Sequence, residues 1–399
     1  MNSAALAHAV GSQDALAALH RLTLDAVLRE AATSRPQALA LAGSADMPVL
    51  TFAALDAEVS RVARQIAALE LGQDVTALVA GGAAPQTLIA TLAAARAGLR
   101  TALAPLSFGA AGIADTCAAC GAAALIGAGG HEFGDVPSLL AEAAASAPQV
   151  RMVASLGAQS ANGIASLDAE GTAAALDNAA AGSDDAAPVL PFVTVARGAA
   201  GLAAMPQNPA KLAASALALQ QALPGDDWPL LSTLAPVTLA GLIGGALAAW
   251  LGGRGLILHG PFTARGFTQA LERAGRAHVI APASAAAQFT AAFAATRAFA
   301  SLTLLHRHAD NDSVRPPLRL PALAPGRIVD LHAIGETLGL ALPRGTLGEV
   351  RPLASAARYV TLANQSILAF EARQSATGGL DSWGAAADIG RDWSDYWRG

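Results

Sequence analysis

Short apolar segments alternate with helix-like segments through most of this sequence, and this alternation restricts its fold more than any other feature. Residues 75–79 are apolar except for Thr76 and lie between Asp74 and Gly81, which is typical of a strand buried on both faces. Residues 84–97 then have a helical composition and end before Gly98. Repetition of this unit predicts an α/β fold, with parallel sheets whose faces are covered by helices.

Apolar spacing and the positions of Gly and Pro locate the expected elements. Thr51 is predicted as the N-cap of a helix that begins at Phe52. Strands are expected at 38–42, 75–79, 100–103, 123–126, 190–195, 230–234, 255–258, 278–280, 302–305 and 327–331, with two short ones near 150–153 and 163–166. Helices are expected at 23–33, 52–66, 84–97, 109–121, 209–223, 241–251, 263–274 and 283–295. After Gly345 the pattern changes to short strands at 359–362 and 367–371, which predicts a small antiparallel unit.

Length and charge narrow the class of protein. A chain of 399 residues predicts two or three packed subdomains. Charged residues make up 14% of the chain, the net charge is −5 and no Lys or Arg run is present, so we expect no nucleic-acid binding. The first eleven residues lack the charged and apolar regions of a signal peptide, so we expect a cytoplasmic protein.

Residues 234–253 carry no formal charge and are long enough to cross a bilayer. They contain Pro236 and five glycines, and they lack flanking positive clusters and aromatic belts. A buried helix is therefore expected rather than a membrane span. The two cysteines, Cys117 and Cys120, lie within a helical pattern and are interpreted as small packed residues rather than a redox or zinc motif.

Several segments, in order, resemble one family. Residues 50–56 (LTFAALD) are similar to the "LTYAELD" motif of the adenylate-forming superfamily, which includes acyl-CoA synthetases, nonribosomal adenylation domains and luciferases. Residues 98–106, 235–241, 267–282 and 383–391 continue the resemblance. It implies two parallel-sheet α/β subdomains, 1–205 and 206–344, and a small antiparallel β-barrel portion, 345–399, ending at the hinge.

The family also has a smaller C-terminal domain that carries a catalytic lysine, and its hinge would begin near Gly399. We therefore expect this domain to be absent here, either naturally or because the chain is a shortened form. CoA would bind only if such a domain were supplied.

The phosphate loop of the family, "SGTTGxPKG", is similar to residues 197–205. Gly198 and Gly201 match, but both threonines are alanine, the lysine position is Ala204 and the closing glycine is Met205. Since each charge-assisted bond to phosphate contributes about 1.5–3 kcal/mol, losing two or three would weaken binding by about a thousandfold. Arg197 is the one nearby residue that could restore charge.

The motif "YGxTE", whose aromatic residue binds adenine and whose glutamate binds Mg²⁺, resembles residues 332–336. The aromatic residue is His332, and Glu336 is kept at the metal position. Glu336 is interpreted either as a Mg²⁺ ligand or as a surface carboxylate on a loop.

Three further motifs complete the resemblance. The glycines of "GGAPL" are replaced by residues 306–309, where Arg307 and His308 would fill ligand space, line a pocket for an acidic ligand or face solvent.

The ribose-binding aspartate of "TGD" is Asp388, with Arg391 shortly after it. The acyl-pocket motif "PLFHxxG" places Thr238 at the gating position and Gly241 at its glycine. No Ser-His-Asp elbow, histidine metal pair or dinucleotide glycine motif is visible.

Two functions from different classes remain open. One is a degenerate synthetase-like protein that binds an acyl or nucleotide ligand, or is the partner of an active enzyme. The other is a divergent active acid–CoA ligase that uses ATP and Mg²⁺. A scaffold for a homodimer is a third hypothesis. The resemblance implies a carboxylic acid or acyl ligand in either of the first two cases.

Overall fold

The computed structural model describes residues 13–43, 49–72, 74–157, 161–168, 192–198, 201–285, 298–309, 328–344, 350–375 and 379–387. The chain divides into two compact units. We call residues 28–206 with 235–238 the N-terminal unit, and residues 1–27, 207–234 and 239–399 the C-terminal unit. The predicted division into 1–205, 206–344 and 345–399 stays a prediction.

The N-terminal unit is built on a sheet with the strand order β7-β6-β5-β3-β4-β8-β9, parallel except for β9. All residues of β3 are buried, as the apolar run 75–79 predicts. The strands are β3 (Thr76–Gly81), β4 (Arg100–Pro105), β5 (Ala124–Ala128), β6 (Met152–Leu156), β7 (Ala165–Ser166), β8 (Val193–Gly198) and β9 (Gly201–Pro206), and β1 (Leu39–Ala42) pairs with β2 (Leu50–Thr51).

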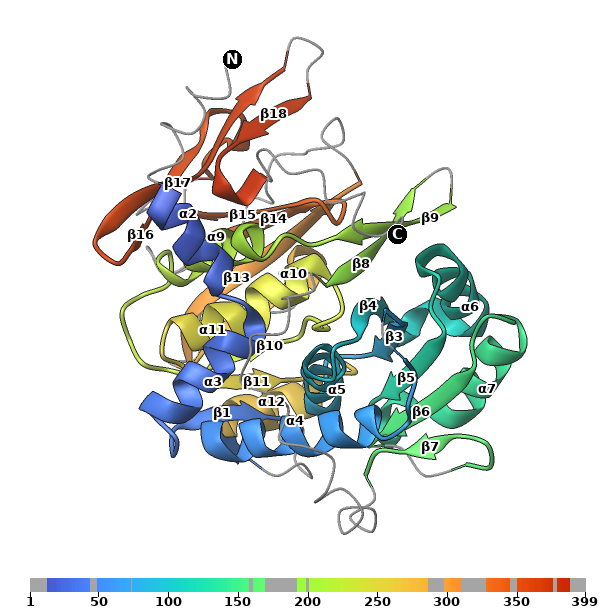
Figure 1. Cartoon of the computed structure of the whole chain (residues 1–399). Helices are drawn as coiled ribbons and strands as arrows, with labels where there is room; N and C mark the ends of the chain where they lie inside the picture. Colours follow the sequence, from blue (N-terminus) through green and yellow to red (C-terminus); the bar gives the residue numbers. More distant parts are fainter. Residues whose placement is uncertain are drawn as a thin grey trace. The chain divides into compact units, whose positions relative to one another are not determined.

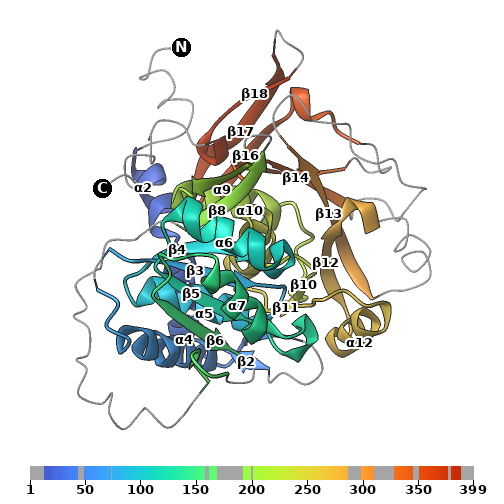
Figure 2. The ribbon, with the colours of Figure 1, turned by 90° about the vertical axis from the view of Figure 1, so that its right-hand side faces the viewer.

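Helices cover both faces of this sheet. They are α4 (Phe52–Ala67), α5 (Pro85–Arg96), α6 (Gly109–Cys120) and α7 (Val136–Ala145). The boundary between the units falls in the earlier helix α3 (Leu24–Ser34). Figure 1 shows α4 and α5 on one side of β3–β6 and α6 and α7 on the other, and in Figure 2 α6 and α7 lie in front of the strands. This arrangement follows from right-handed crossovers that leave β3 and β5 in opposite directions.

Two local predictions in this unit are confirmed. The Thr51 side chain accepts a hydrogen bond from the Ala54 amide and caps α4. Cys117 and Cys120 lie in α6 as free thiols. Burial raises the pKa of Cys117 to about 11 and that of Cys120 to about 12, so neither is a reactive thiolate at neutral pH.

The C-terminal unit has a sheet with the order β15-β14-β13-β12-β10-β11, in which only β15 is antiparallel to its neighbour. Its strands are β10 (Leu230–Ser232), β11 (Leu256–Leu258), β12 (Ala277–Pro282), β13 (Phe299–His308), β14 (Ile328–Ile334) and β15 (Leu338–Pro343). Its helices are α2 (Gln13–Arg21), α9 (Pro209–Gln220), α10 (Leu239–Leu242), α11 (Ala248–Leu251) and α12 (Ala264–Ala274).

The uncharged segment 234–253 is mostly buried, as predicted, with Gly253 exposed at its end. It forms α10, a π-helical segment (Ile243–Leu247) and α11, and the residues of all three are buried except Leu251, which is partly exposed. Among the described residues, no helix is both long enough and apolar enough to cross a bilayer.

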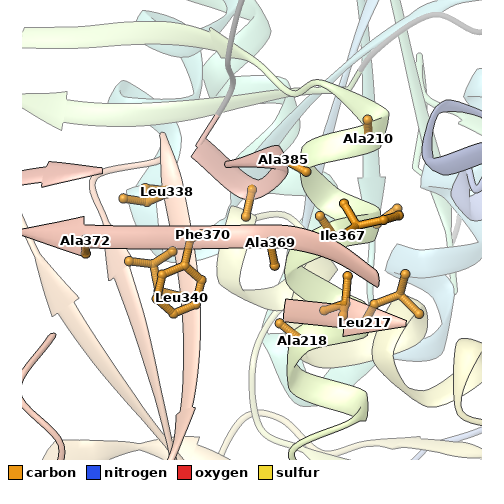
Figure 3. Packing of buried hydrophobic residues seen from close by; sticks show 14 of the residues in the cluster. Ala210, Leu217, Ala218, Leu338, Leu340, Ile367, Ala369, Phe370, Ala372 and Ala385 are labelled. Carbon is orange, nitrogen blue, oxygen red and sulfur yellow. The ribbon is translucent and has the colours of Figure 1, made fainter. Parts of the chain in front are cut away.

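A small sheet follows, made of β16 (Ala357–Leu362), β17 (Gln365–Gln374) and β18 (Leu380–Trp383). Its central strand β17 packs through Ile367 and Phe370 into a core shared with Leu217 of α9 and Leu340 of β15 (Figure 3). The side-chain amide of Gln221 exchanges two hydrogen bonds with the backbone of Thr361 on the edge strand β16, at 2.8 and 3.1 Å. The predicted antiparallel unit is therefore confirmed, but in the part of the chain that the structure describes it is an open sheet and not a closed barrel.

The strand–helix alternation was predicted correctly, whereas α2, α7, β2, β9, β15 and β18 were not expected. The expected helix at 283–295 lies mostly outside the described residues.

Candidate functional site

Polar side chains gather where β13 and β14 end, at the carboxyl edge of the sheet in the C-terminal unit. The register pairs His306 with His332, and residues two apart on a strand share a face, so His306, His308, Asp330 and His332 lie on one face. With Arg344, which follows β15, we call these residues the histidine cluster. Ligands of α/β proteins commonly bind at this edge of a sheet.

The base of the cluster is a buried ion pair. Arg344 donates from Nε to Asp330 Oδ2 and from Nη2 to Oδ1, both at 2.9 Å. His306 Nε2 lies 2.8 Å from the same Oδ1. Burial alone would raise the pKa of Asp330, but hydrogen bonds and charge from His306 and Arg344 hold it below its ordinary value. The carboxylate therefore stays ionised, and His306 donates to it from Nε2.

His332 lies at the centre of the cluster and has no exposed surface. Its ring is 5.0 Å from the His306 ring, with planes 20° apart, which matches the spacing of neighbouring strands and stacks the two rings. Its Nδ1 is 3.1 Å from His308 Nε2. The centroids of those two rings are 5.4 Å apart and their planes differ by 12°. That separation is the N–N distance plus two ring radii, so these rings meet edge to edge.

Burial, together with the charge of His306, lowers the pKa of His332 to about 3, although Asp330 opposes the shift. His332 is therefore neutral, and its Nε2 is buried with no hydrogen-bond partner among the described residues. The three rings do not converge on a common point. Among the described residues, no group of three His, Cys, Asp or Glu side chains could hold a metal ion.

Glu336 lies in the turn between β14 and β15, next to Gly335, whose φ of +55° suits glycine. Its carbonyl accepts a hydrogen bond from Gln207 Nε2 at 2.7 Å. Its carboxylate Oε2 accepts one from the Leu239 amide, the first of α10, at 2.5 Å. Because Glu336 is 8% exposed, its interpretation as a surface carboxylate is wrong.

The predicted phosphate loop falls on two antiparallel strands of the N-terminal unit, with residues 199–200 outside the described residues. β8 and β9 are antiparallel, and Gly198 pairs with Gly201 where the two strands meet. Gly201 has a φ of +110°. Whether this turn binds phosphate stays a prediction.

The other predicted residues lie in several places. Thr238 is buried, and its hydroxyl lies 3.4 Å from the Ala235 carbonyl oxygen. Gly241 lies within α10 and is also buried. Arg307 is exposed on β13, whereas His308 beside it belongs to the cluster. Asp388 and Arg391 lie outside the described residues.

Sequence reasoning did not identify Asp330, Arg344 or Gln207. Asp330 did leave a signal, since a lone carboxylate in the apolar run 328–334 needs a buried cationic partner. Arg344 could be assigned as that partner only once β14 and β15 were known to pair.

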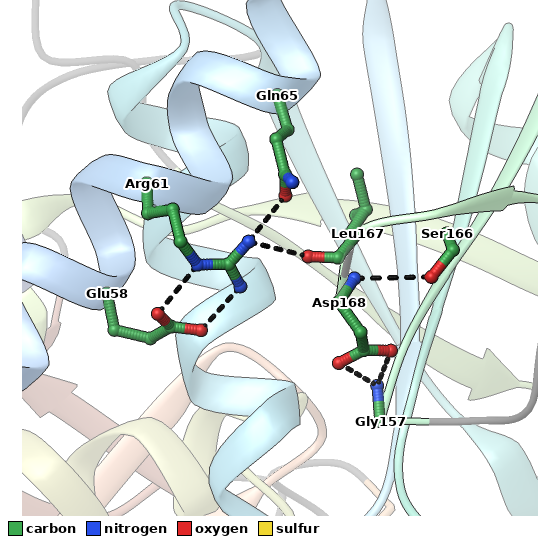
Figure 4. A network of polar contacts seen from close by, with 7 residues as sticks. All are labelled: Glu58, Arg61, Gln65, Gly157, Ser166, Leu167 and Asp168. Carbon is green, nitrogen blue, oxygen red and sulfur yellow. Dashed lines mark hydrogen bonds and ion pairs between the residues drawn. The ribbon is translucent and has the colours of Figure 1, made fainter. Parts of the chain in front are cut away.

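A second polar network lies in the N-terminal unit (Figure 4). Arg61 of α4 binds both carboxylate oxygens of Glu58, at 2.6 and 2.8 Å, and donates to the Leu167 carbonyl at 3.1 Å. Asp168 accepts from the Gly157 amide at 2.8 and 3.0 Å. These bonds fasten the segment after β7 to α4 and to the end of β6, so the network has a structural role.

Comparison with known families decides the relationship. A model described as "AMP-binding enzyme" matches residues 28–305, most of the chain. The chain belongs to this family of AMP-binding enzymes. Comparison with curated protein sequences gives no match.

Solved structures share the fold of this AMP-binding family member. The apo structure of Mycobacterium smegmatis MbtA is 20% identical, with a TM-score of 0.65 over 96% of this chain and 72% of that one. The anthranilate CoA ligase AuaEII, in complex with anthranoyl-AMP, is 14% identical, with a TM-score of 0.63 over 96% and 73%. The luciferase-like enzyme of the nonluminescent mealworm Zophobas morio is 11% identical, with a TM-score of 0.64 over 94% and 89%.

The family implies an adenine nucleotide and Mg²⁺, and the histidine cluster does not fit a base stacked on His332. One face of His332 is against His306, one edge is against His308, and no surface is exposed. A metal ion at Glu336 would compete with the Leu239 amide for Oε2. Adenine therefore does not fit at His332 as the side chains are arranged, and a metal ion at Glu336 would have to share the carboxylate with the Leu239 amide.

Proposed function

We propose that this AMP-binding family member has kept the fold without efficient adenylation, and that it binds a carboxylic acid or acyl ligand or supports a partner enzyme. The observation that carries the proposal is the filled position at His332. In the resemblance, this position provides the aromatic ring that binds adenine. A base could reach the His332 ring only after the His306 or His308 side chain moved, which would break hydrogen bonds at 2.8 or 3.1 Å.

The composition of the β8–β9 hairpin supports the same proposal. At the positions where the family has threonines and a lysine, residues 199–204 offer only alanine. Gly198 and Gly201 pair where β8 and β9 meet but provide no side-chain donor. Charge-assisted bonds to a triphosphate would therefore be fewer, and the affinity for ATP lower.

An acyl ligand is consistent with the apolar character of α10 and the π-helical segment, since apolar walls are what such a ligand requires. The proposal includes a cytoplasmic location and a homodimer or partner enzyme.

Thermal unfolding with ATP and Mg²⁺ tests the proposal, because a ligand that binds the folded state raises Tm. We expect no shift with ATP and Mg²⁺ relative to Mg²⁺ alone. A shift of several degrees would contradict the proposal. The double variant His306→Gly, His308→Ala lacks the two rings beside His332, and its Tm shift with ATP and Mg²⁺ is compared with that of the unmodified protein. The same thermal unfolding with fatty and aromatic acids tests the acyl ligand.

The alternative is a divergent acid–CoA ligase, and the position of Glu336 favours it. The turn and the bond from Gln207 Nε2 to the Glu336 backbone carbonyl hold this residue at the carboxyl edge of the sheet, where its carboxylate accepts from the Leu239 amide. Pyrophosphate exchange that depends on a carboxylic acid, and that is lost in Glu336→Gln, would establish this alternative. Exchange unaffected by Glu336→Gln would show that this residue has no role in it.

A further inference from the structure

Two adjacent glycines, Gly244 and Gly245, lie inside the π-helical segment of the C-terminal unit, and both are buried. Glycine destabilises a helix by about 1 kcal/mol relative to alanine, because it loses more backbone freedom on folding. π-Helical insertions are frequent at functional sites. The pair therefore directs attention to the space that the two absent side chains leave.

The space at Gly244 has aliphatic walls. A Cβ built on Gly244 would lie 3.4 Å from Ile280 Cδ1, 3.4 Å from Leu331 Cδ2 and 3.5 Å from Leu234 Cδ1. These are ordinary contact distances between carbon atoms. The absent side chain thus leaves a space of the size of a methyl group, between the π-helical segment and the sheet.

Gly245 leaves more room. Its φ of −115° and ψ of −118° are not helical. A Cβ built on it would have no atom within 4 Å, apart from its chain neighbours and the backbone of its own helix, although the residue is buried. Closely packed side chains leave few such voids in protein interiors. The two glycines therefore border an internal apolar cavity, in which a ligand gains contacts that the protein alone does not make.

One polar side chain lies beneath these glycines. Thr303 of β13 is in register with Ile280 of β12 and with Val329 of β14, and Leu331 is two residues beyond Val329. Ile280 and Leu331 therefore share a face of the sheet with Thr303 and lie on either side of it. Because both side chains approach Gly244, this glycine lies over β13 at Thr303.

The hydroxyl of Thr303 is available to a ligand. The residue has no exposed surface, and its Oγ1 has no hydrogen-bond partner among the described residues. A buried hydroxyl without a partner costs free energy that a hydrogen bond from a ligand recovers. Thr303 is in register two residues before Pro282, the last residue of β12. It therefore lies about 7 Å below the carboxyl end of that strand, the edge at which ligands of such sheets bind.

We infer that the ligand of this cavity is a short aliphatic carboxylic acid with a hydroxyl group near the end of its chain. The aliphatic chain lies against Gly244, Gly245 and the side chains around them, and its hydroxyl forms a hydrogen bond with Thr303 Oγ1. The analogue without the hydroxyl is discriminated against, because it leaves Thr303 unpartnered. The inference rests on the proposed function, since it assumes that the acyl ligand binds beside the π-helical segment.

The test is isothermal titration of the whole chain with hexanoic acid and with its ω-hydroxy derivative. We expect the hydroxy acid to bind about tenfold more tightly, the contribution of one buried hydrogen bond. Thr303→Val replaces the hydroxyl by a methyl group of similar shape and should remove this preference, whereas Thr303→Ser should keep it. Gly245→Ala should weaken both acids by about tenfold or more, because its methyl group enters the cavity. Gly225→Ala, at an exposed glycine with open space, is the matched control and should change neither affinity.

The unmodified protein decides first, so the inference can be refuted even if Gly245→Ala fails to fold. Binding of hexanoic acid that equals or exceeds that of the hydroxy acid would overturn the inference and leave the proposed acyl ligand in place. A preference for the hydroxy acid that persists in Thr303→Val would also overturn it. Binding of neither acid would do the same, and thermal unfolding with the other fatty and aromatic acids then decides whether the proposed acyl ligand stands.

Discussion

Acidification should destabilise the C-terminal unit through His332. The pKa of His332 is about 3 in the folded protein, whereas an unfolded histidine has a pKa of about 6.5. Between these values the unfolded chain binds more protons, so the stability that the neutral ring provides is complete above pH 6.5 and is lost as the pH falls below it. The free energy of unfolding falls by 2.303RT for each pH unit below 6.5, which gives a loss of about 1.4 kcal/mol at pH 5.5. This loss is the same for any folded-state pKa of His332 that is well below 5.5.

The assay is urea unfolding of the unmodified protein and of His332→Phe at about pH 7.5 and about pH 5.5, with free energies from linear extrapolation. The variant should lose about 1.4 kcal/mol less between the two pH values. His278, whose pKa burial lowers to about 4, should behave similarly in His278→Phe. Exposed Arg307 is the matched control, and Arg307→Gln should not change the pH dependence. Equal pH dependence in His332→Phe and the unmodified protein would refute this reasoning.

Three further changes have expected outcomes, each measured as the free energy of unfolding. Arg344→Met leaves the buried Asp330 carboxylate with His306 as its remaining partner and should cost about 3 kcal/mol, and a cost below 1 kcal/mol would contradict the buried pair. Thr51→Ala should cost about 1 kcal/mol by removing the cap of α4, while Thr51→Ser should cost little. Gly384→Ala should cost about 3 kcal/mol, because φ is +118° and a Cβ would meet the Ala369 carbonyl oxygen at 2.5 Å. Gly121→Ala, with a φ of +61° and open space, should cost only about 1–2 kcal/mol.

The predictability of the fold differed between elements. Strands such as β3 and β5 were recognisable because burial on both faces makes every residue apolar. β9 was interpreted as part of a loop because its six residues resemble a phosphate-loop motif and show no strong alternation. Closure of the small sheet depends on pairing between distant edges, which apolar spacing does not encode.

The candidate site was predictable in its location but not in its contacts. Residues 306–308 and 332–336 were identified from the sequence, and the structure brings both to the same edge of one sheet. The contact of His332 with both His306 and His308 depends on the register of two strands that are separated by residues 309–327. A shift of one residue would have put His332 on the opposite face, so the cluster could not be predicted from spacing alone.

The bond between Gln221 and Thr361 bears on how this protein behaves at high concentration. An edge strand with free peptide groups is a template on which the strand of another molecule can add. Here the side-chain amide of Gln221 makes hydrogen bonds with both the backbone N–H and the carbonyl of Thr361, as a neighbouring strand would. Growth of intermolecular sheet from this point of β16 is blocked within the chain itself, so the small sheet can remain exposed without recruiting a second copy there.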